Sequence, residues 1–286
     1  MNFTKMQGAG NDFILIEAGN ISRDWSKTAT AMCDRHFGVG ADGLVLVLPS
    51  DKADFRMREF NPDGSEAEAC GNGLRCLAKY VLYKGLIRAE TQEISVETLA
   101  GVRKAKFIRA GSKTATIQVG MGKPIFKAEE IPVVIEPSKQ NLLDIKTILT
   151  YPVTVDRQRL LLDFVSMGNP HAIYFWQQPV SDFPLEPVGP KVERHKIFPK
   201  RTNFEVGRVI NRREIEARVW ERGVGETLAC GSGACAIAVA AQLHGYIDKK
   251  VDIKLPGGTL NVQWDGAGEV FLSGPAEVVF NGEWPE

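Results

Sequence analysis

Two cysteines occupy almost the same local sequence, and their setting is suited to chemistry. Cys70 lies in ACGNGLRC and Cys230 in ACGSGACA, so a Gly-polar-Gly turn follows each and leads into an apolar helical pattern. The glycines leave the first-turn N–H groups of such a helix uncovered, and the helix dipole places partial positive charge there. A turn of this kind binds a carboxylate or phosphate and lowers the pKa of a thiol from its free value of about 8.5.

The duplication of this setting suggests a pair of thiols that act together. If the two halves of the chain are related by pseudo-symmetry, Cys70 and Cys230 face one another across an interdomain cleft. An amino acid whose carboxylate is held by both helix N-termini would then have its α-carbon between the sulfurs. One thiolate can take the α-proton while the other thiol donates a proton from the opposite face. The pattern therefore predicts inversion of a stereocentre without a cofactor, with the helix N-termini stabilising the charge that develops.

An internal repeat of about half the chain length supports this pseudo-symmetry. Gly10-Asn11 precedes Cys70 at nearly the spacing at which Gly168-Asn169 precedes Cys230. Just upstream of each cysteine, the segments FRMREFN and IEARVWE alternate between apolar and polar residues, as strands do. Each half also closes with a glycine near a proline. We therefore predict two homologous α+β halves.

The helices and the domain boundaries follow from the same repeat. We expect one helix after Gly73, ending at Gly85, and another after Gly233, ending at Gly245. The second is apolar nearly all round and should be buried. The predicted domains are residues 1–121 plus 275–286, which carry Cys70, and residues 122–274, which carry Cys230. The stretch 122–160 lies between the repeats and is expected to contain the crossover.

Composition excludes several classes of protein. The chain has 286 residues, with 35 Lys plus Arg and 35 Asp plus Glu, so no net charge attracts nucleic acid or an anionic membrane. No apolar run approaches the ~20 residues of a membrane helix, and MNFTKMQ is not a secretory leader, so we expect a cytoplasmic protein. Five cysteines, an odd number in a long chain, are not a secreted disulfide framework.

The remaining cysteines and one glycine motif point to no metal or cofactor. Cys33, Cys76 and Cys235 are expected in the core, because free cysteine packs as a small hydrophobe. The cysteine spacings are not those of zinc ligands, and CxxC is absent. GVGADG matches the dinucleotide fingerprint literally, but a strand follows it where a helix is needed. A reversible disulfide between Cys70 and Cys230 stays open as an oxidised, inactive form.

Six motifs in fixed order closely resemble the diaminopimelate epimerase family over nearly the whole chain. They are GAGNDF, GVGADGL, FNPDGSEAEACGNGLRC, SMGNPH, WERGVGETLACGSGACA and LSGPAE. The motif ACGxG alone would indicate only the wider superfamily, which includes proline racemase-like enzymes and phenazine-biosynthesis-like isomerases. The resemblance implies a pyridoxal-independent epimerase that converts LL- to meso-diaminopimelate for lysine and cell-wall synthesis. It also implies two pseudo-symmetric domains, each a β-sheet wrapped round a central helix, an active site in the cleft between them, and a homodimer.

The resemblance also assigns roles to residues. It implies that Cys70 and Cys230 are the acid and base thiols, and that His171 and Glu221 help to set their protonation. Among the substrate contacts that it implies, Arg222 suits a carboxylate and Glu221 an ammonium group. The implied substrate-binding residues are Asn11, Asn61, Gly71, Asn72, Asn169, Asn203, Glu221, Arg222, Gly231 and Ser232. Two positions depart from the family pattern: Gln7 stands where His is frequent, and Gly43 where some members have Gln.

The sequence is also compatible with three other functions. A racemase of another amino acid, of the histidine or proline type, would share the thiols, but Glu221 and Arg222 make little sense for proline. A thiol–disulfide redox protein would exchange electrons with glutathione and leave amino acids unlabelled by solvent. A binding module that closes on an amino acid would tolerate serine at both cysteine positions.

Overall fold

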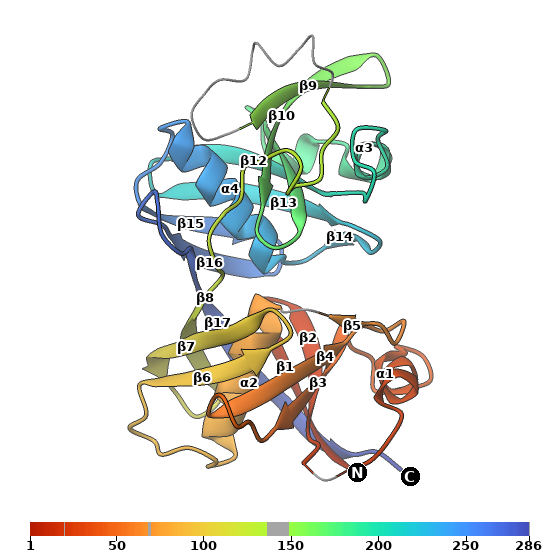
Figure 1. Ribbon diagram of the computed structural model, residues 1–286, viewed down its shortest axis with the longest axis vertical. Helices are drawn as coiled ribbons and strands as arrows, with labels where there is room; N and C mark the ends of the chain where they lie inside the picture. The colour runs from red at the N-terminus through yellow and green to blue at the C-terminus, as the bar shows by residue number, and fades with distance from the viewer. Residues whose placement is uncertain (20, 68–69, 136–148, 286) are drawn as a thin grey trace. The chain divides into compact units, whose positions relative to one another are not determined.

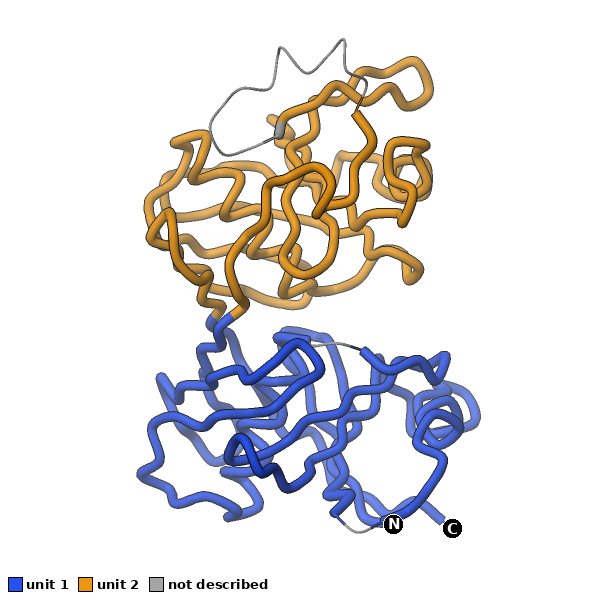
Figure 2. The backbone as a smooth tube through the Cα atoms, viewed as in Figure 1, with its two compact units in different colours: residues 1–120, 273–286 blue, residues 121–272 orange. Residues whose placement is uncertain are grey.

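The computed structural model describes residues 1–19, 21–67, 70–135 and 149–285 (Figure 1). The chain forms two compact units (Figure 2): unit 1 comprises residues 1–120 and 273–286, and unit 2 comprises residues 121–272. Part of the stretch expected to carry the crossover, residues 136–148, lies outside the described residues.

Unit 1 is a ring of strands that closes on itself. Sequential neighbours β1 and β2 are antiparallel, β2 and β3 are parallel, and β3 and β4 are antiparallel. The ring continues through β6, β7 and β8, and β17 closes it by pairing with both β8 and β1. The strands are β1 (Asn2–Gly8), β2 (Asn11–Glu17), β3 (Gly43–Leu48), β4 (Phe55–Phe60), β5 (Glu66–Ala67), β6 (Glu93–Thr98), β7 (Gly101–Ala110), β8 (Thr114–Gly120) and β17 (Phe271–Glu283).

Helix α2 (Gly71–Tyr83) fills this ring and contacts six of its strands. Its buried side chains include Leu74, Leu77 and Val81, which recur at helical spacing. The helix ends where Gly85 takes a left-handed conformation at φ 70°, as the sequence predicts. The outer face of β3 and β4 is covered by α1 (Trp25–Cys33).

Unit 2 repeats the order of antiparallel and parallel strand pairings seen in unit 1. From β10 to β13 the strands pair in order, with β11 and β12 parallel, and β13 continues to β15 and β16. An isolated bridge between Ile125 and Ser166 adds the start of the unit to β10. The strands are β9 (Leu149–Val155), β10 (Gln158–Ser166), β11 (Pro170–Phe175), β12 (Asn203–Asn211), β13 (Glu214–Glu221), β14 (Gly225–Thr227), β15 (Lys250–Leu255) and β16 (Gly258–Gln263).

Helix α4 (Gly231–Leu243) occupies the centre of unit 2, and its residues from Ala234 to Ala241 are buried, as its apolar sequence predicts. It ends before Gly245, which has φ 73°. The outer face of β12 and β13 packs on α3 (Leu185–Glu193), which follows a short turn of 3₁₀ helix, η2 (Val180–Asp182). The predicted α+β class is therefore correct. Within the described residues, no helix is both long enough and apolar enough to cross a membrane.

Candidate functional site

Both predicted thiols are the N-caps of the two central helices. Cys70 caps α2 with φ −128° and ψ 122°, and Cys230 caps α4 with φ −117° and ψ 116°. Each sulfur accepts a hydrogen bond from a backbone N–H three residues on, at 3.5 Å from Gly73 and 3.3 Å from Gly233. An N-cap conformation leaves the other first-turn N–H groups available to an anion. The two cysteines therefore have the same local geometry in their respective units.

In unit 1, three of the predicted residues lie together at this helix end. Asn72 Nδ2 donates to Asn11 Oδ1 at 3.0 Å, and the Cys70 sulfur lies 4.0 Å from the same oxygen. The buried guanidinium of Arg75 donates to Asn72 Oδ1 at 2.8 Å, and Asn11 Nδ2 donates to Asp42 at 2.7 Å. These contacts fix the orientation of both amides beside the thiol.

A buried carboxyl group lies beneath the same helix end. Glu59, on β4, is 6% exposed, and a Cβ placed on Gly73 would come within 2.5 Å of its Oε2. Burial raises the pKa of Glu59 to about 8, and a hydrogen bond with Cys70 opposes that rise in part.

In unit 2, a chain of hydrogen bonds leads from the helix end into the core. The Cys230 sulfur lies 3.5 Å from Ser232 Oγ, which accepts from Asn169 Nδ2 at 3.3 Å. Asn169 Oδ1 in turn lies 2.9 Å from His171 Nε2. The other ring nitrogen, Nδ1, lies 2.6 Å from the carboxylate of Glu205, and both of these side chains are fully buried. Four polar residues therefore connect in series behind the thiol.

Two carboxylates influence Cys230. Glu221 accepts a hydrogen bond from Thr227 at 2.5 Å and another from the thiol, while burial raises the pKa of the Glu221 carboxyl. Burial, followed by the charges of Glu221 and Glu205, raises the pKa of the Cys230 thiol well above its usual value. The helix end alone predicts the opposite direction, but here desolvation and two nearby carboxylates outweigh it.

Three more residues that the resemblance assigns to substrate binding, Asn203, Arg222 and Asn61, form hydrogen bonds within their own units. Asn203 Nδ2 donates to the Pro170 carbonyl at 2.9 Å, and its Oδ1 accepts from the backbone N–H of Arg222 at 2.9 Å. The exposed Arg222 guanidinium donates to the Lys200 carbonyl at 3.2 Å. In unit 1, Asn61 is held in the turn after β4 by a 2.9 Å hydrogen bond to Ser65.

Glu59 and Glu205 are the site residues that the sequence analysis missed. Their positions differ between the repeats: Glu59 pairs with Val45 across β4 and β3, whereas Glu205 pairs with Val219 across β12 and β13. The two units therefore supply this carboxyl from different strands, β4 in unit 1 and β12 in unit 2, but in both units it lies beneath the equivalent glycine, Gly73 or Gly233. Strand alternation could have revealed Glu59, because it shares the buried face of β4 with an apolar residue, Met57.

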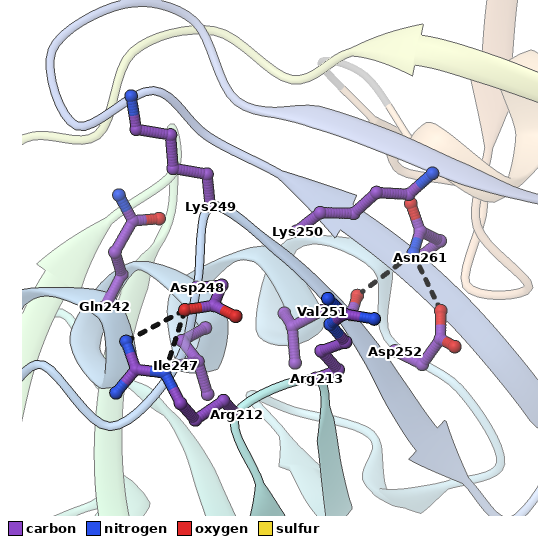
Figure 3. A pocket seen from close by; sticks show the side chains of 10 residues that line it. All are labelled: Arg212, Arg213, Gln242, Ile247, Asp248, Lys249, Lys250, Val251, Asp252 and Asn261. Carbon is purple, nitrogen blue, oxygen red and sulfur yellow. Dashed lines mark hydrogen bonds and ion pairs between the residues drawn. The ribbon is translucent and has the colours of Figure 1, made fainter.

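A separate surface cavity of about 680 Å³ lies elsewhere in unit 2 (Figure 3). It includes Gln242 at the C-terminal end of α4, the opposite end from Cys230. Two of its charged side chains neutralise one another, because Arg212 pairs with Asp248 at 2.8 Å. Across the portion of the chain that the structure describes, no group of His, Cys, Asp or Glu side chains is arranged to hold a metal ion. The predicted thiols therefore remain the centre of the candidate site.

Proteins with similar sequences include diaminopimelate epimerases from several organisms. A family model described as diaminopimelate epimerase matches residues 3–127 and 164–279. The diaminopimelate epimerase of Moorella thermoacetica is 47% identical over 288 residues, which covers 100% of this chain and 99% of the relative. The diaminopimelate epimerase of Methanococcus maripaludis is 46% identical over 285 residues and covers 99% of each chain.

Solved structures with lower identity share the fold. A phenazine biosynthesis protein of the PhzF family from Bacillus anthracis matches with a TM-score of 0.73 at 19% identity and covers 100% of this chain and 99% of its own. A hydroxyproline epimerase from Agrobacterium vitis matches with a TM-score of 0.70 at 14% identity and covers 99% and 90%. Because the family model and relatives that match along their full length agree, the chain belongs to the diaminopimelate epimerase family.

Proposed function

We propose that this protein epimerises LL-2,6-diaminopimelate to the meso isomer, with Cys70 and Cys230 as its acid and base and with no cofactor. The observation that carries the proposal is the duplicated cap: each cysteine begins a central helix with the same backbone conformation. Membership of the family supplies the substrate. The alternative of a histidine- or proline-type racemase is not favoured, because relatives that match over the full length are diaminopimelate epimerases.

The proposed chemistry transfers one proton in each direction. The thiolate of one cysteine removes the α-proton, and the thiol of the other gives its proton to the opposite face of the carbon. The first-turn N–H groups at Gly71-Asn72 and Gly231-Ser232 would bind the carboxylate of the reacting centre and stabilise charge that spreads onto it. After one turnover the two cysteines have exchanged protonation states.

The proposal gives the other predicted residues two tasks. Because only one of the two α-centres inverts, the distal amino-acid end must be held: Arg222 would bind its carboxylate and Glu221 its ammonium group. His171 and Glu221 would set the protonation of the thiols. The interaction of Glu221 with the Cys230 thiol supports this task. So does the chain of hydrogen bonds that leads from His171 through Asn169 and Ser232 to the Cys230 sulfur. The proposed substrate contacts also include Asn11, Asn61, Asn72, Asn169 and Asn203.

We further propose the setting in which this reaction takes place. The product would serve lysine and peptidoglycan precursor synthesis in the cytoplasm, and the enzyme would be a homodimer. We propose that the two homologous halves are residues 1–121 with 275–286 and residues 122–274. The strands that surround α2 and α4 in the two units support that division.

Proton NMR in heavy water tests the proposed reaction. Reduced protein is incubated with LL-diaminopimelate, and the products are separated on a chiral phase. We expect the meso isomer to appear with deuterium at the inverted α-carbon. Absence of both exchange and meso product, with the thiols confirmed as reduced, would contradict the proposal.

Matched cysteine variants test the roles of the two thiols. Cys70→Ser and Cys230→Ser should each lower the rate by about 10²-fold or more, because a serine hydroxyl is a far weaker base near neutral pH. Cys33→Ala is the control, since Cys33 is a buried core residue of α1. If either serine variant kept more than about a tenth of the wild-type rate, two-thiol chemistry would be wrong.

A further inference from the structure

Glu59 is a carboxyl group in a place where carboxyl groups are costly. It lies on the face of β4 that packs on the N-terminal turn of α2, where both its Oε2 and the Met57 side chain approach Gly73. The residue is 6% exposed, and Oε2 has no hydrogen-bond partner among the described residues. A buried carboxyl without full hydrogen bonding is unfavourable for folding. Stability alone therefore does not account for Glu59.

The comparison with unit 2 shows what is distinctive about Glu59. The equivalent space beneath Gly233 holds Glu205, whose Oε1 is bound to the imidazole of His171 at 2.6 Å. Among the described residues no imidazole pairs with Glu59, which lies instead beneath Gly73, the residue whose N–H donates to the Cys70 sulfur, and the Cys70 thiol lowers the pKa of Glu59. In unit 2, the Cys230 thiol interacts with the carboxyl of Glu221. Glu221 lies two residues after Val219, which is the residue of β13 that corresponds to Glu59 of β4. Each thiol thus has a carboxyl partner of its own, supplied from a different position.

We propose that Glu59 is the positioning residue of Cys70: its buried carboxyl holds the thiol at the end of α2 and exchanges one proton with it. The proposal deepens the proposed function and rests on it. The exchange is balanced within the pair, because a neutral Glu59 gives its proton to the Cys70 thiolate and becomes a carboxylate, and the reverse step restores both. No other reactant is required. The burial that raises the pKa of Glu59 to about 8 brings this carboxyl close to a thiol in proton affinity.

This pairing has a consequence for the catalytic cycle. After each turnover the two cysteines have exchanged protonation states, and Cys70 must regain or lose a proton before the next turnover in the same direction. A buried carboxyl beneath the helix turn that the thiol caps, shielded from solvent, can hold that proton. The amide of glutamine can still donate a hydrogen bond, but it can neither accept nor release the proton.

Glu59→Gln and thiol alkylation test the proposal without substrate. The rate at which iodoacetamide modifies Cys70 is measured against pH, and trypsin then releases residues 59–75, in which Cys70 is the sole cysteine. Loss of the carboxylate removes a negative charge that disfavours the thiolate, so we expect the midpoint of the profile to move to lower pH by about one unit or more. Cys76 lies in a separate tryptic peptide, so its modification is measured apart from that of Cys70. Burial raises the pKa of Cys76 to about 12, and the charges of Arg75, Glu59 and Asp12 also influence it.

Controls separate an effect on the pair from a general effect. Glu97→Gln removes a carboxylate from β6, the neighbour of β4, and should leave the profile unchanged. A profile that is the same in Glu59→Gln and wild type would overturn the proposal. If Glu59→Gln does not fold, infrared titration of the protonated carboxyl band answers the question: Cys70→Ala should shift the titration of Glu59, and an unshifted titration would overturn the pairing.

The outcome also distinguishes this proposal from the proposed function. A shifted alkylation profile in a protein that leaves diaminopimelate unchanged would support the thiol–carboxyl pair and remove the substrate assignment. Where epimerisation is present, the pH profile of kcat should shift in Glu59→Gln while KM changes little, because Glu59 acts through Cys70. A fall in activity with an unchanged pH profile would indicate a purely structural residue and overturn the proposal.

Discussion

The buried carboxyl of Glu59 should make the stability of unit 1 fall as pH rises. The unfolded chain loses this proton near the ordinary pKa of 4.5, whereas the folded chain keeps it until about 8. Within that window the folded state binds more protons, so the free energy of unfolding decreases by at most about 1.4 kcal/mol per pH unit. The whole window corresponds to an upper limit of about 5 kcal/mol. Glu59→Gln removes the titration and should remove this dependence.

Each unit contains a fully buried cysteine that can report its own unfolding. Cys76 lies within α2 and Cys235 within α4, and both are 0% exposed. Brief exposure to a disulfide reagent that reacts at low pH, such as 4,4′-dithiodipyridine, labels each one as its unit unfolds in urea. We expect the gap in unfolding free energy between Glu59→Gln and wild type, reported by Cys76, to widen by several kcal/mol from about pH 5 to about pH 8. The gap reported by Cys235 should stay constant.

Two results would refute this reasoning. A gap at Cys76 that is flat across the window would mean that Glu59 is ionised in the folded protein throughout it. An equal change at Cys76 and Cys235 would mean that the effect does not originate in the carboxyl beneath α2.

Three further perturbations test other contacts of the site. His171→Asn leaves Glu205 buried without its imidazole and should destabilise unit 2 by about 3 kcal/mol near pH 8. The loss should become smaller as the pH falls, because burial raises the pKa of Glu205 and favours its protonation; urea unfolding with Cys235 labelling measures both effects. Gly73→Ala puts a methyl group 2.5 Å from Glu59 Oε2 and should lower the unfolding free energy of unit 1 by about 1–3 kcal/mol, as urea unfolding with Cys76 labelling would measure. An unchanged unfolding free energy would mean that the carboxyl moves freely. Arg222→Ala should raise KM for diaminopimelate about tenfold or more with a smaller effect on kcat, and an unchanged KM would remove Arg222 from the substrate site.

The two central helices and most strands were predictable because local sequence determines them. The ends of α2 and α4 follow from Gly85 and Gly245, which take the left-handed conformation that glycine allows. The strands β6 and β15 show the alternating burial that their sequences indicate. The two thiols were found because their glycine-flanked setting occurs twice.

Other features depend on tertiary contacts that local patterns do not encode. The helix α3 contains Pro190 and Gly189, both unfavourable for a helix, yet it forms because Gly189 packs closely on Trp220, whose indole N–H donates to Glu193 at 2.9 Å. The direction of the Cys230 pKa could not be derived either. A helix N-terminus is visible in the sequence, whereas the desolvation that opposes it appears only in the folded unit.

The route of the chain between its units also sets an order for biosynthesis. Unit 2 ends at residue 272, so the ribosome has made all of it while unit 1 still lacks β17. Until that strand emerges, β1 and β8 leave unpaired edges on a sheet that was started first. We therefore expect unit 1 to keep these two edges open until the last residues of the chain are available, with the edges as its most aggregation-prone surface during synthesis.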